Sequence, residues 1–124
     1  MLEPTTIEQT ALNYLLSNLD VLPEHYHLFE VVGTTCFGNN EWMINISMVG
    51  LVGKYWNVFV DGNTGKILPD CEFNSDCQDC NEPHQYSHLP DYLNQLLDRL
   101  TVKLLREIKH CFVCYNDYHN IYLI

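Results

Sequence analysis

A cluster of cysteine and histidine residues in the second half of the sequence has the composition of a metal site. Its spacing is Cys-x5-Cys-x2-Cys-x3-His-x3-His, formed by Cys71, Cys77, Cys80, His84 and His88. Zinc takes four ligands, and thiolate sulfur and imidazole nitrogen suit it well. A Cys-x-x-Cys pair lets two thiolates reach one ion, and nearby histidines complete the tetrahedron. The spacing therefore predicts that zinc staples residues 70–88, against the alternative of a solvated acidic loop with free thiols.

The same stretch concentrates acidic residues. Residues 70–88 contain five acidic side chains and no basic one, which is half of the net charge of −10. These side chains belong to Asp70, Glu72, Asp76, Asp79 and Glu82. Because holding like charges together is unfavourable, we expect a metal ion or a cationic partner to offset them. We predict that these five residues form the partner-binding surface.

A second Cys-x-x-Cys pair consists of Cys111 and Cys114. Joining it to Cys77 and Cys80 would give a four-cysteine zinc site, but the helix expected over 89–110 spans about 33 Å. The linker between Cys80 and that helix reaches ~30 Å at most. Such a site therefore requires a broken helix, a different fold-back or a second chain. Buried structural cysteine is the favoured role, because the negative end of the preceding helix opposes the thiolate that redox catalysis needs.

Two further patterns favour structural roles. Asp61-Gly62-Asn63-Thr64-Gly65 has the first residues of a calcium loop, with Glu72 at the twelfth position. However, Lys66 occupies the sixth position, where a calcium loop needs glycine, so a plain turn is expected. Cys36 lies in an apolar segment, where cysteine is expected to be a small core residue.

The elements that position these residues begin with an amphipathic helix. Thr5 and Glu8 form a Thr-x-x-Glu capping box directly after Pro4, and Leu22-Pro23 is expected to end the helix. Apolar residues recur at helical spacing, which predicts one buried face. They are Ile7, Ala11, Tyr14, Leu15 and Leu19.

Three strands are expected next. Residues 28–37 are rich in β-branched and aromatic side chains, and residues 42–49 and 55–60 alternate with the period of a strand. Turn residues follow these segments at 38–40, 50–53 and 61–65. Strand-like residues resume briefly at 66–68, and the order of the elements predicts an antiparallel meander.

A second, longer helix is predicted over residues 89–110. Its apolar stripe consists of Leu89, Leu93, Leu96, Leu100, Leu104 and Ile108, and it is widened by Tyr92, Leu97 and Leu105. Pro90 and Asp91 fit its first turn, and residues 111–124 are expected to form a C-terminal strand or hairpin. The sequence therefore predicts one α+β domain over residues 1–124. In it, the acidic Cys/His loop joins the meander to a long helix packed across the sheet.

Composition restricts the class of function. A chain of 124 residues with 47% hydrophobic residues supports one core rather than disorder. Six basic against 16 acidic residues disfavour binding to nucleic acid or to anionic lipid. No apolar run approaches the ~20 residues of a membrane span, and the start, Met1-Leu2-Glu3-Pro4, lacks the basic residues of a secretory signal. We therefore expect a cytoplasmic protein.

Residues 56–67 read Trp-Asn-Val-Phe-Val-Asp-Gly-Asn-Thr-Gly-Lys-Ile, a strand that ends in a Val-Asp-x-x-Thr-Gly-Lys-Ile hairpin. After a helix and two strands, this hairpin resembles the last hairpin of small helix-plus-meander domains. These include the PepSY type and the YrhB-type domains found among bacterial toxin-immunity proteins. The resemblance covers residues 5–68 and implies a binding or inhibitory module without catalytic residues. Residues 69–124 have no counterpart in these domains.

These patterns favour a small acidic, non-enzymatic protein that binds and inhibits a basic protein partner. An immunity protein and an inhibitor of a nucleic-acid enzyme are the specific forms expected. A negative surface steers a cationic partner and speeds association, although acidic charge also serves solubility alone. A zinc-stapled structural or adaptor module is the alternative, and an enzyme with a cryptic site is the third possibility.

Overall fold

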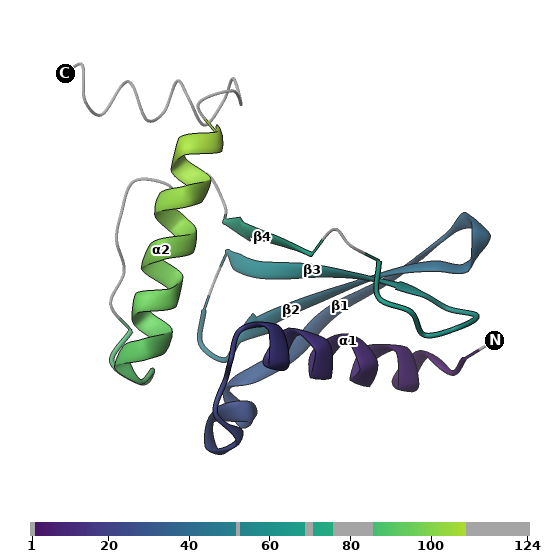
Figure 1. Cartoon of the computed structure of the whole chain (residues 1–124), viewed down its shortest axis with the longest axis horizontal. Helices are drawn as coiled ribbons and strands as arrows, with labels where there is room; N and C mark the ends of the chain where they lie inside the picture. Colours follow the sequence, from purple (N-terminus) through teal and green to yellow (C-terminus); the bar gives the residue numbers. More distant parts are fainter. Residues whose placement is uncertain (1, 52, 69–70, 76–85, 109–124) are drawn as a thin grey trace. The chain divides into compact units, whose positions relative to one another are not determined.

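The computed structural model describes residues 2–51, 53–68, 71–75 and 86–108 of the chain (Figure 1). These residues belong to two compact units, Met1–Asn74 and Ser75–Ile124. The first unit contains a helix and a four-stranded antiparallel sheet, and the second contains a later helix. The predicted α+β class is therefore confirmed. The packing of the long helix on the sheet and the single domain stay predictions, and the predicted C-terminal strands lie outside the described residues.

Helix α1 (Pro4–Asn18) begins earlier than the predicted capping box allows. Pro4 occupies the first turn, where its fixed φ angle suits the helix and its missing N–H has no cost. Thr5 therefore lies inside the helix rather than at its N-cap. The carboxylate of Glu8 accepts a hydrogen bond from the Thr34 hydroxyl, so the capping-box prediction is wrong.

The end of α1 also differs from the prediction. The helix stops before Leu22-Pro23, because Asp20 adopts a left-handed conformation with a φ angle of 55°. The N–H groups of Asp20 and Val21 donate to carbonyls of the last helical turn at 3.2 and 3.0 Å. This pair of bonds is the Schellman pattern that closes many helices. A short 3-10 helix, η1 (Pro23–Leu28), then leads to the sheet.

The sheet is the predicted meander with one additional strand. Its strands are β1 (Phe29–Phe37), β2 (Glu41–Met48), β3 (Lys54–Asp61) and β4 (Glu72–Ser75), in that spatial order. A three-residue connection, η2 (Gly38–Asn40), joins β1 to β2. Asn39 and Asn40 have φ angles of 69° and 57°, which asparagine tolerates better than most residues.

Strand β4 lies within the stretch predicted to be a Cys/His loop, so the loop prediction is wrong for Glu72–Ser75. Its polar sequence has low strand propensity, but tertiary packing routinely overrides propensity. The ring of Phe73 packs on the ring of Trp56, with centroids 5.2 Å apart. Phe29 packs on Trp56 as well, at 5.9 Å. The aromatic contact is the physical reason for a strand here.

The core of the first unit lies between α1 and one face of the sheet (Figure 1). The buried apolar residues of the helix and of the two central strands are Ile7, Ala11, Leu15, Leu16, Ile44, Ile46, Met48, Trp56, Val58 and Val60. Paired residues on neighbouring strands share a face. The register pairs Ile44 with Val58, so the two strands present one continuous apolar layer to α1. The predicted alternation of β2 and β3 is therefore confirmed. Of the predicted stripe of α1, Ile7, Ala11 and Leu15 are buried, whereas Tyr14 and Leu19 are half-buried.

Cys36 does not lie in this core. It is exposed, as are Thr34, Thr35 and Phe37 around it. β1 is an outer strand, and its last residues gain no cover from a second neighbouring strand among the described residues. The interpretation of Cys36 as a core residue is therefore wrong.

Helix α2 (Asp91–Ile108) confirms the second predicted helix, but its buried face differs. Leu93, Asn94, Leu97 and Thr101 are buried, as is Leu89 just before the helix. Leu96, Leu100 and Leu104, which the stripe predicted to lie in the core, are half-buried.

Asn94 lies on the buried face and is hydrogen bonded to residues that precede the helix. Its side-chain oxygen accepts a hydrogen bond from the Tyr86 N–H at 2.9 Å. Its side-chain nitrogen donates to the carbonyls of Tyr86 at 3.0 Å and Leu89 at 3.3 Å. These bonds tie the first turn of α2 to the residues just before it, on the side of the helix that carries Asn94.

Candidate functional site

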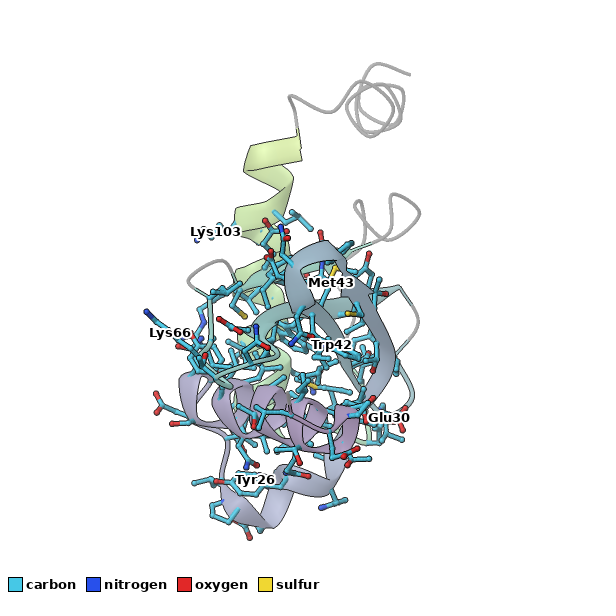
Figure 2. The ribbon with its side chains drawn as sticks, turned by 90° about the vertical axis from the view of Figure 1, so that its right-hand side faces the viewer. Tyr26, Glu30, Trp42, Met43, Lys66 and Lys103 are labelled. Carbon is cyan, nitrogen blue, oxygen red and sulfur yellow. The ribbon has the colours of Figure 1, made fainter. Side chains whose placement is uncertain are left out.

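The face of the sheet opposite α1 carries its own set of side chains. Successive residues of a strand point to opposite faces, so Met43, Tyr55 and Phe59 lie away from the buried layer. Figure 2 shows Met43 and Trp42 on opposite sides of the sheet, with Trp42 toward α1. Among the described residues of Met1–Asn74, no helix covers this side. We call it the open face and define it by Glu30, Glu41, Met43, Asn45, Tyr55, Asn57, Phe59, Asp61 and Glu72. Ser47 lies on the same side of β2 but is buried, and its hydroxyl donates to the Lys54 carbonyl at 2.7 Å.

The centre of the open face is apolar and ordered by contacts between strands. Met43 and Phe59 are direct cross-strand partners, and both side chains are half-buried, as is Tyr55. Next to them, the side-chain nitrogen of Asn45 donates a hydrogen bond to the side-chain oxygen of Asn57. Because this bond joins β2 to β3, it fixes two polar side chains in the middle of the face.

Two carboxylates lie directly opposite each other at one end of the open face. Glu41 of β2 pairs with Asp61 of β3, and like charges in a cross-strand pair are unfavourable. The Asp61 carboxylate accepts a hydrogen bond from the Asn63 N–H at 2.8 Å, and the Asp61 carbonyl accepts one from the Gly65 N–H at 2.8 Å. Asp61 thus closes its own turn, which confirms the plain turn expected here.

The two outer strands each add one carboxylate to the open face. Glu30 of β1 lies between Phe29 and Val31, which pair with buried residues of β2; alternation therefore places Glu30 on the other side. Glu72 of β4 precedes Phe73, whose ring packs on Trp56. Alternation again places Glu72 on the open face, and both glutamates are exposed.

Within the described residues of Met1–Asn74, no basic side chain lies on the open face to balance these charges. The basic residues among the described positions of Met1–Asn74 are Lys54 and Lys66. Lys54 is buried and alternates in phase with Trp56, toward α1. Lys66 is exposed in the turn after β3 and extends to the side of the molecule, away from Met43 (Figure 2). The open face is therefore a negatively charged surface with an apolar centre.

The structure describes two of the five predicted metal ligands, and they belong to different units. Cys71 precedes β4 and is half-buried, and His88 is exposed in the turn before α2. The His88 ring stands edge-on to the Tyr86 ring, 6.1 Å away. Cys77, Cys80 and His84 lie outside the described residues. Within the described part of the chain, no three His, Cys, Asp or Glu side chains come together, and the zinc site stays a prediction.

The environment of Cys71 disfavours nucleophilic chemistry at this thiol. Burial raises the pKa of Cys71, and the neighbouring carboxylate of Glu72 raises it further. A raised pKa keeps the thiol protonated at neutral pH, and the thiolate is the nucleophile and the metal ligand. A cation bound beside Cys71 would reverse this preference.

Of the predicted partner-binding residues, the structure describes Glu72, which it places on the open face. The other four, Asp70, Asp76, Asp79 and Glu82, lie outside the described residues. Glu30, Glu41 and Asp61 do not stand out by charge density along the sequence, because that density does not distinguish the two faces of a strand. Period-two alternation along β2 and β3 does identify two of them, since Glu41 is in phase with Met43 and Asp61 with Phe59.

Comparisons with protein families, with curated proteins and with solved structures found no match to this chain. The resemblance of residues 5–68 to PepSY-type and YrhB-type domains stays a prediction. None of the described helices is both long and apolar enough to cross a membrane.

Proposed function

We propose that this chain is a non-enzymatic binding protein whose open face recognises and blocks a basic protein partner. One observation carries the proposal: each of the four strands contributes a carboxylate to a face with an apolar centre and, among the described residues of Met1–Asn74, no basic side chain. The carboxylates are those of Glu30, Glu41, Asp61 and Glu72.

The arrangement has the parts that a protein interface needs. Burial of apolar and aromatic side chains at the centre of an interface gives most of the affinity. Met43, Tyr55 and Phe59 are partly buried already, so docking costs little conformational entropy. The surrounding carboxylates steer a cationic partner and exclude an acidic one.

The facing carboxylates favour arginine as the residue that the open face binds. A guanidinium placed between Glu41 and Asp61 would relieve their repulsion and form charge-assisted hydrogen bonds with both. The same planar group stacks on aromatic rings such as those of Tyr55 and Phe59. Enzymes that act on nucleic acids present clustered arginines, so a nuclease-like enzyme or toxin is the partner class that we propose.

The acidic residues of 70–88 are the second part of the proposed binding surface. Glu72 belongs both to the open face and to residues 70–88, and the other four acidic residues of that stretch flank β4 in the sequence. We propose that they enlarge the negative surface. A zinc staple built from Cys71, Cys77, Cys80, His84 and His88 is a separate prediction. Elemental analysis of protein purified without added metal tests it, because a staple requires near-stoichiometric zinc.

The open face is tested by nuclear magnetic resonance titration with two probes, decaarginine and decalysine. We expect amide shifts to concentrate at residues 41–45 and 55–61, with tighter binding of decaarginine because lysine does not stack on aromatic rings as well. Shifts confined to α1, or spread evenly over all acidic residues, would contradict a defined binding face. Equal affinity for the two probes would contradict the role of the aromatic centre.

A further inference from the structure

The outer edge of β1 is a second surface with recognisable chemistry. β1 is the first strand in the order β1-β2-β3-β4, and among the described residues no strand pairs with its other side. An unpaired edge presents a row of backbone donors and acceptors, which is a template for another strand. Proteins usually protect such edges with charged side chains, proline or bulges.

In β1, the features that prevent pairing with another strand occur only in the first half of the strand. Glu30 is charged, and a β-bulge at Val32 interrupts the register with β2. Beyond the bulge, residues 33–37 read Gly-Thr-Thr-Cys-Phe, with no charge and no proline. Thr34, Thr35, Cys36 and Phe37 are all exposed, and threonine and phenylalanine favour strands. This half of the edge is open to pairing.

We infer that residues 33–37 pair antiparallel with the same segment of a second copy of this chain. A two-fold axis at Thr35 places Thr35 opposite its own copy, Thr34 opposite Cys36, and Gly33 opposite Phe37. Every pair in this register is uncharged, and threonine pairs across strands are favourable. Glu30 lies beyond the bulge and outside the paired segment, so no carboxylate faces its own copy.

The lack of charge in the paired segment favours a copy of this chain over the basic partner proposed for the open face. A basic strand would find no carboxylate among residues 33–37. The Glu8 carboxylate that accepts a hydrogen bond from Thr34 belongs to α1 and lies on the helix side of β1, where Thr34 pairs with Ile44. Self-pairing would join two four-stranded sheets into one, and it goes beyond the proposed function because it uses backbone groups at the edge rather than the open face.

The dependence on salt concentration distinguishes self-association through β1 from binding to the open face. Each copy carries a net charge of −10, so the two copies repel each other, and added salt screens this repulsion. Self-association through β1 should therefore strengthen with salt, whereas binding of a basic partner to the open face should weaken. Self-association through β1 can therefore fail in the experiment while binding of a basic partner to the open face is observed, or binding can fail while self-association is observed.

The oligomeric state of the full chain tests the inference. Sedimentation equilibrium at up to millimolar concentration should show a monomer–dimer equilibrium that shifts toward dimer at high salt. Thr35→Lys should abolish the dimer, because two like charges would then face each other across the axis. Ser17→Lys adds the same charge at an exposed position of α1 and should leave the dimer intact. Circular dichroism checks that both variants fold.

A cross-link tests the register. Thr35→Cys combined with Cys36→Ser should form a disulfide between the two copies of residue 35, since paired strands bring Cα atoms within the range that a disulfide spans. Ser17→Cys in the same Cys36→Ser background is the control, and peptide mapping identifies the linkage. A monomer under all conditions, a dimer that Thr35→Lys leaves intact, or no cross-link through residue 35 would each overturn the inference.

Discussion

At the scale of single residues, Asp20 combines an unfavourable conformation with an unfavourable charge. Its φ angle of 55° lies in the left-handed region, and its carboxylate lies at the negative end of α1. Asp20→Gly should raise the free energy of unfolding by about 1 kcal/mol, because glycine has no Cβ to clash there. Thermal unfolding followed by tryptophan fluorescence measures this, since Trp42 and Trp56 both lie in the first unit.

Asp20→Asn is the matched control for that substitution. Asparagine removes the charge and tolerates the left-handed region less well than glycine. The gain from asparagine should therefore be smaller than the gain from glycine. Equal unfolding free energies for the two variants would show that only the charge matters at this position.

The reactivity of Cys71 reports on its carboxylate neighbour. Burial and then the charge of Glu72 raise the pKa of the thiol. Glu72→Gln removes the second cause, so the pH at which iodoacetamide modifies Cys71 at half its maximal rate should fall. Peptide mapping by mass spectrometry follows Cys71 separately from the other cysteines. An unchanged or higher midpoint would show that the carboxylate does not act on this thiol.

The same shift has a consequence for stability. The folded chain holds the Cys71 proton more tightly than the unfolded chain does, since the folded pKa is raised. The contribution to stability is therefore fully present below the ordinary thiol pKa of about 8.5 and is lost as the pH rises through the folded pKa. Cys71→Ser should reduce this alkaline loss of stability.

At the scale of elements, α2 offers a direct comparison between two leucines. Leu97 is 1% exposed, whereas Leu100 is half-buried. Leu97→Ala should lower the free energy of unfolding by about 2–5 kcal/mol through lost burial and a new cavity. Leu100→Ala should cost about 1 kcal/mol. Denaturant unfolding followed by circular dichroism measures both, and a larger cost at Leu100 would mean that the stripe predicted from the sequence is the buried face.

For some helices and strands, the sequence pattern alone is enough to predict both the element and its buried face. Strict period-two alternation located β2 and β3 and their buried faces, because a one-residue slip would expose the whole apolar set. The stripe of α1 located its core face for the same reason. In α2, apolar residues occur on more than half of the helix circumference, so their spacing alone did not choose among Leu93, Leu97 and Leu100. The buried face also includes the polar residue Asn94, which hydrogen bonds to the preceding turn, and apolar periodicity does not report such a contact.

Strand β4 and the exposure of Cys36 needed information from elsewhere in the chain. β4 has few strand-forming residues and depends on the contact of Phe73 with Trp56, which are far apart in sequence. Cys36 belongs to a segment with strand composition, and composition does not say whether a strand is central or outer. The spatial order of the strands decides that.

At the scale of the whole molecule, the distribution of charge over faces matters more than its distribution along the sequence. The sequence located Glu72 within the acidic stretch, and the sheet brings it to the same face as Glu30, Glu41 and Asp61. Three of these carboxylates come from a part of the chain that carries no unusual charge density. The candidate site is therefore only partly visible in the sequence, because the pleat of each strand sorts its charges onto two sides.

The open face is tested most directly by two triple variants with equal net charge. Glu30→Gln, Glu41→Gln and Glu72→Gln together neutralise exposed carboxylates of the open face, and Glu3→Gln, Asp20→Asn and Glu24→Gln neutralise exposed carboxylates elsewhere in the first unit. Association of each variant with immobilised decaarginine is measured by surface plasmon resonance over a range of salt concentrations. The open-face variant should associate more slowly, bind more weakly and lose most of its salt dependence, while the control variant should stay close to the unmodified chain. Equal losses in the two variants would show that net charge alone attracts the probe and would contradict the open face as the recognition surface.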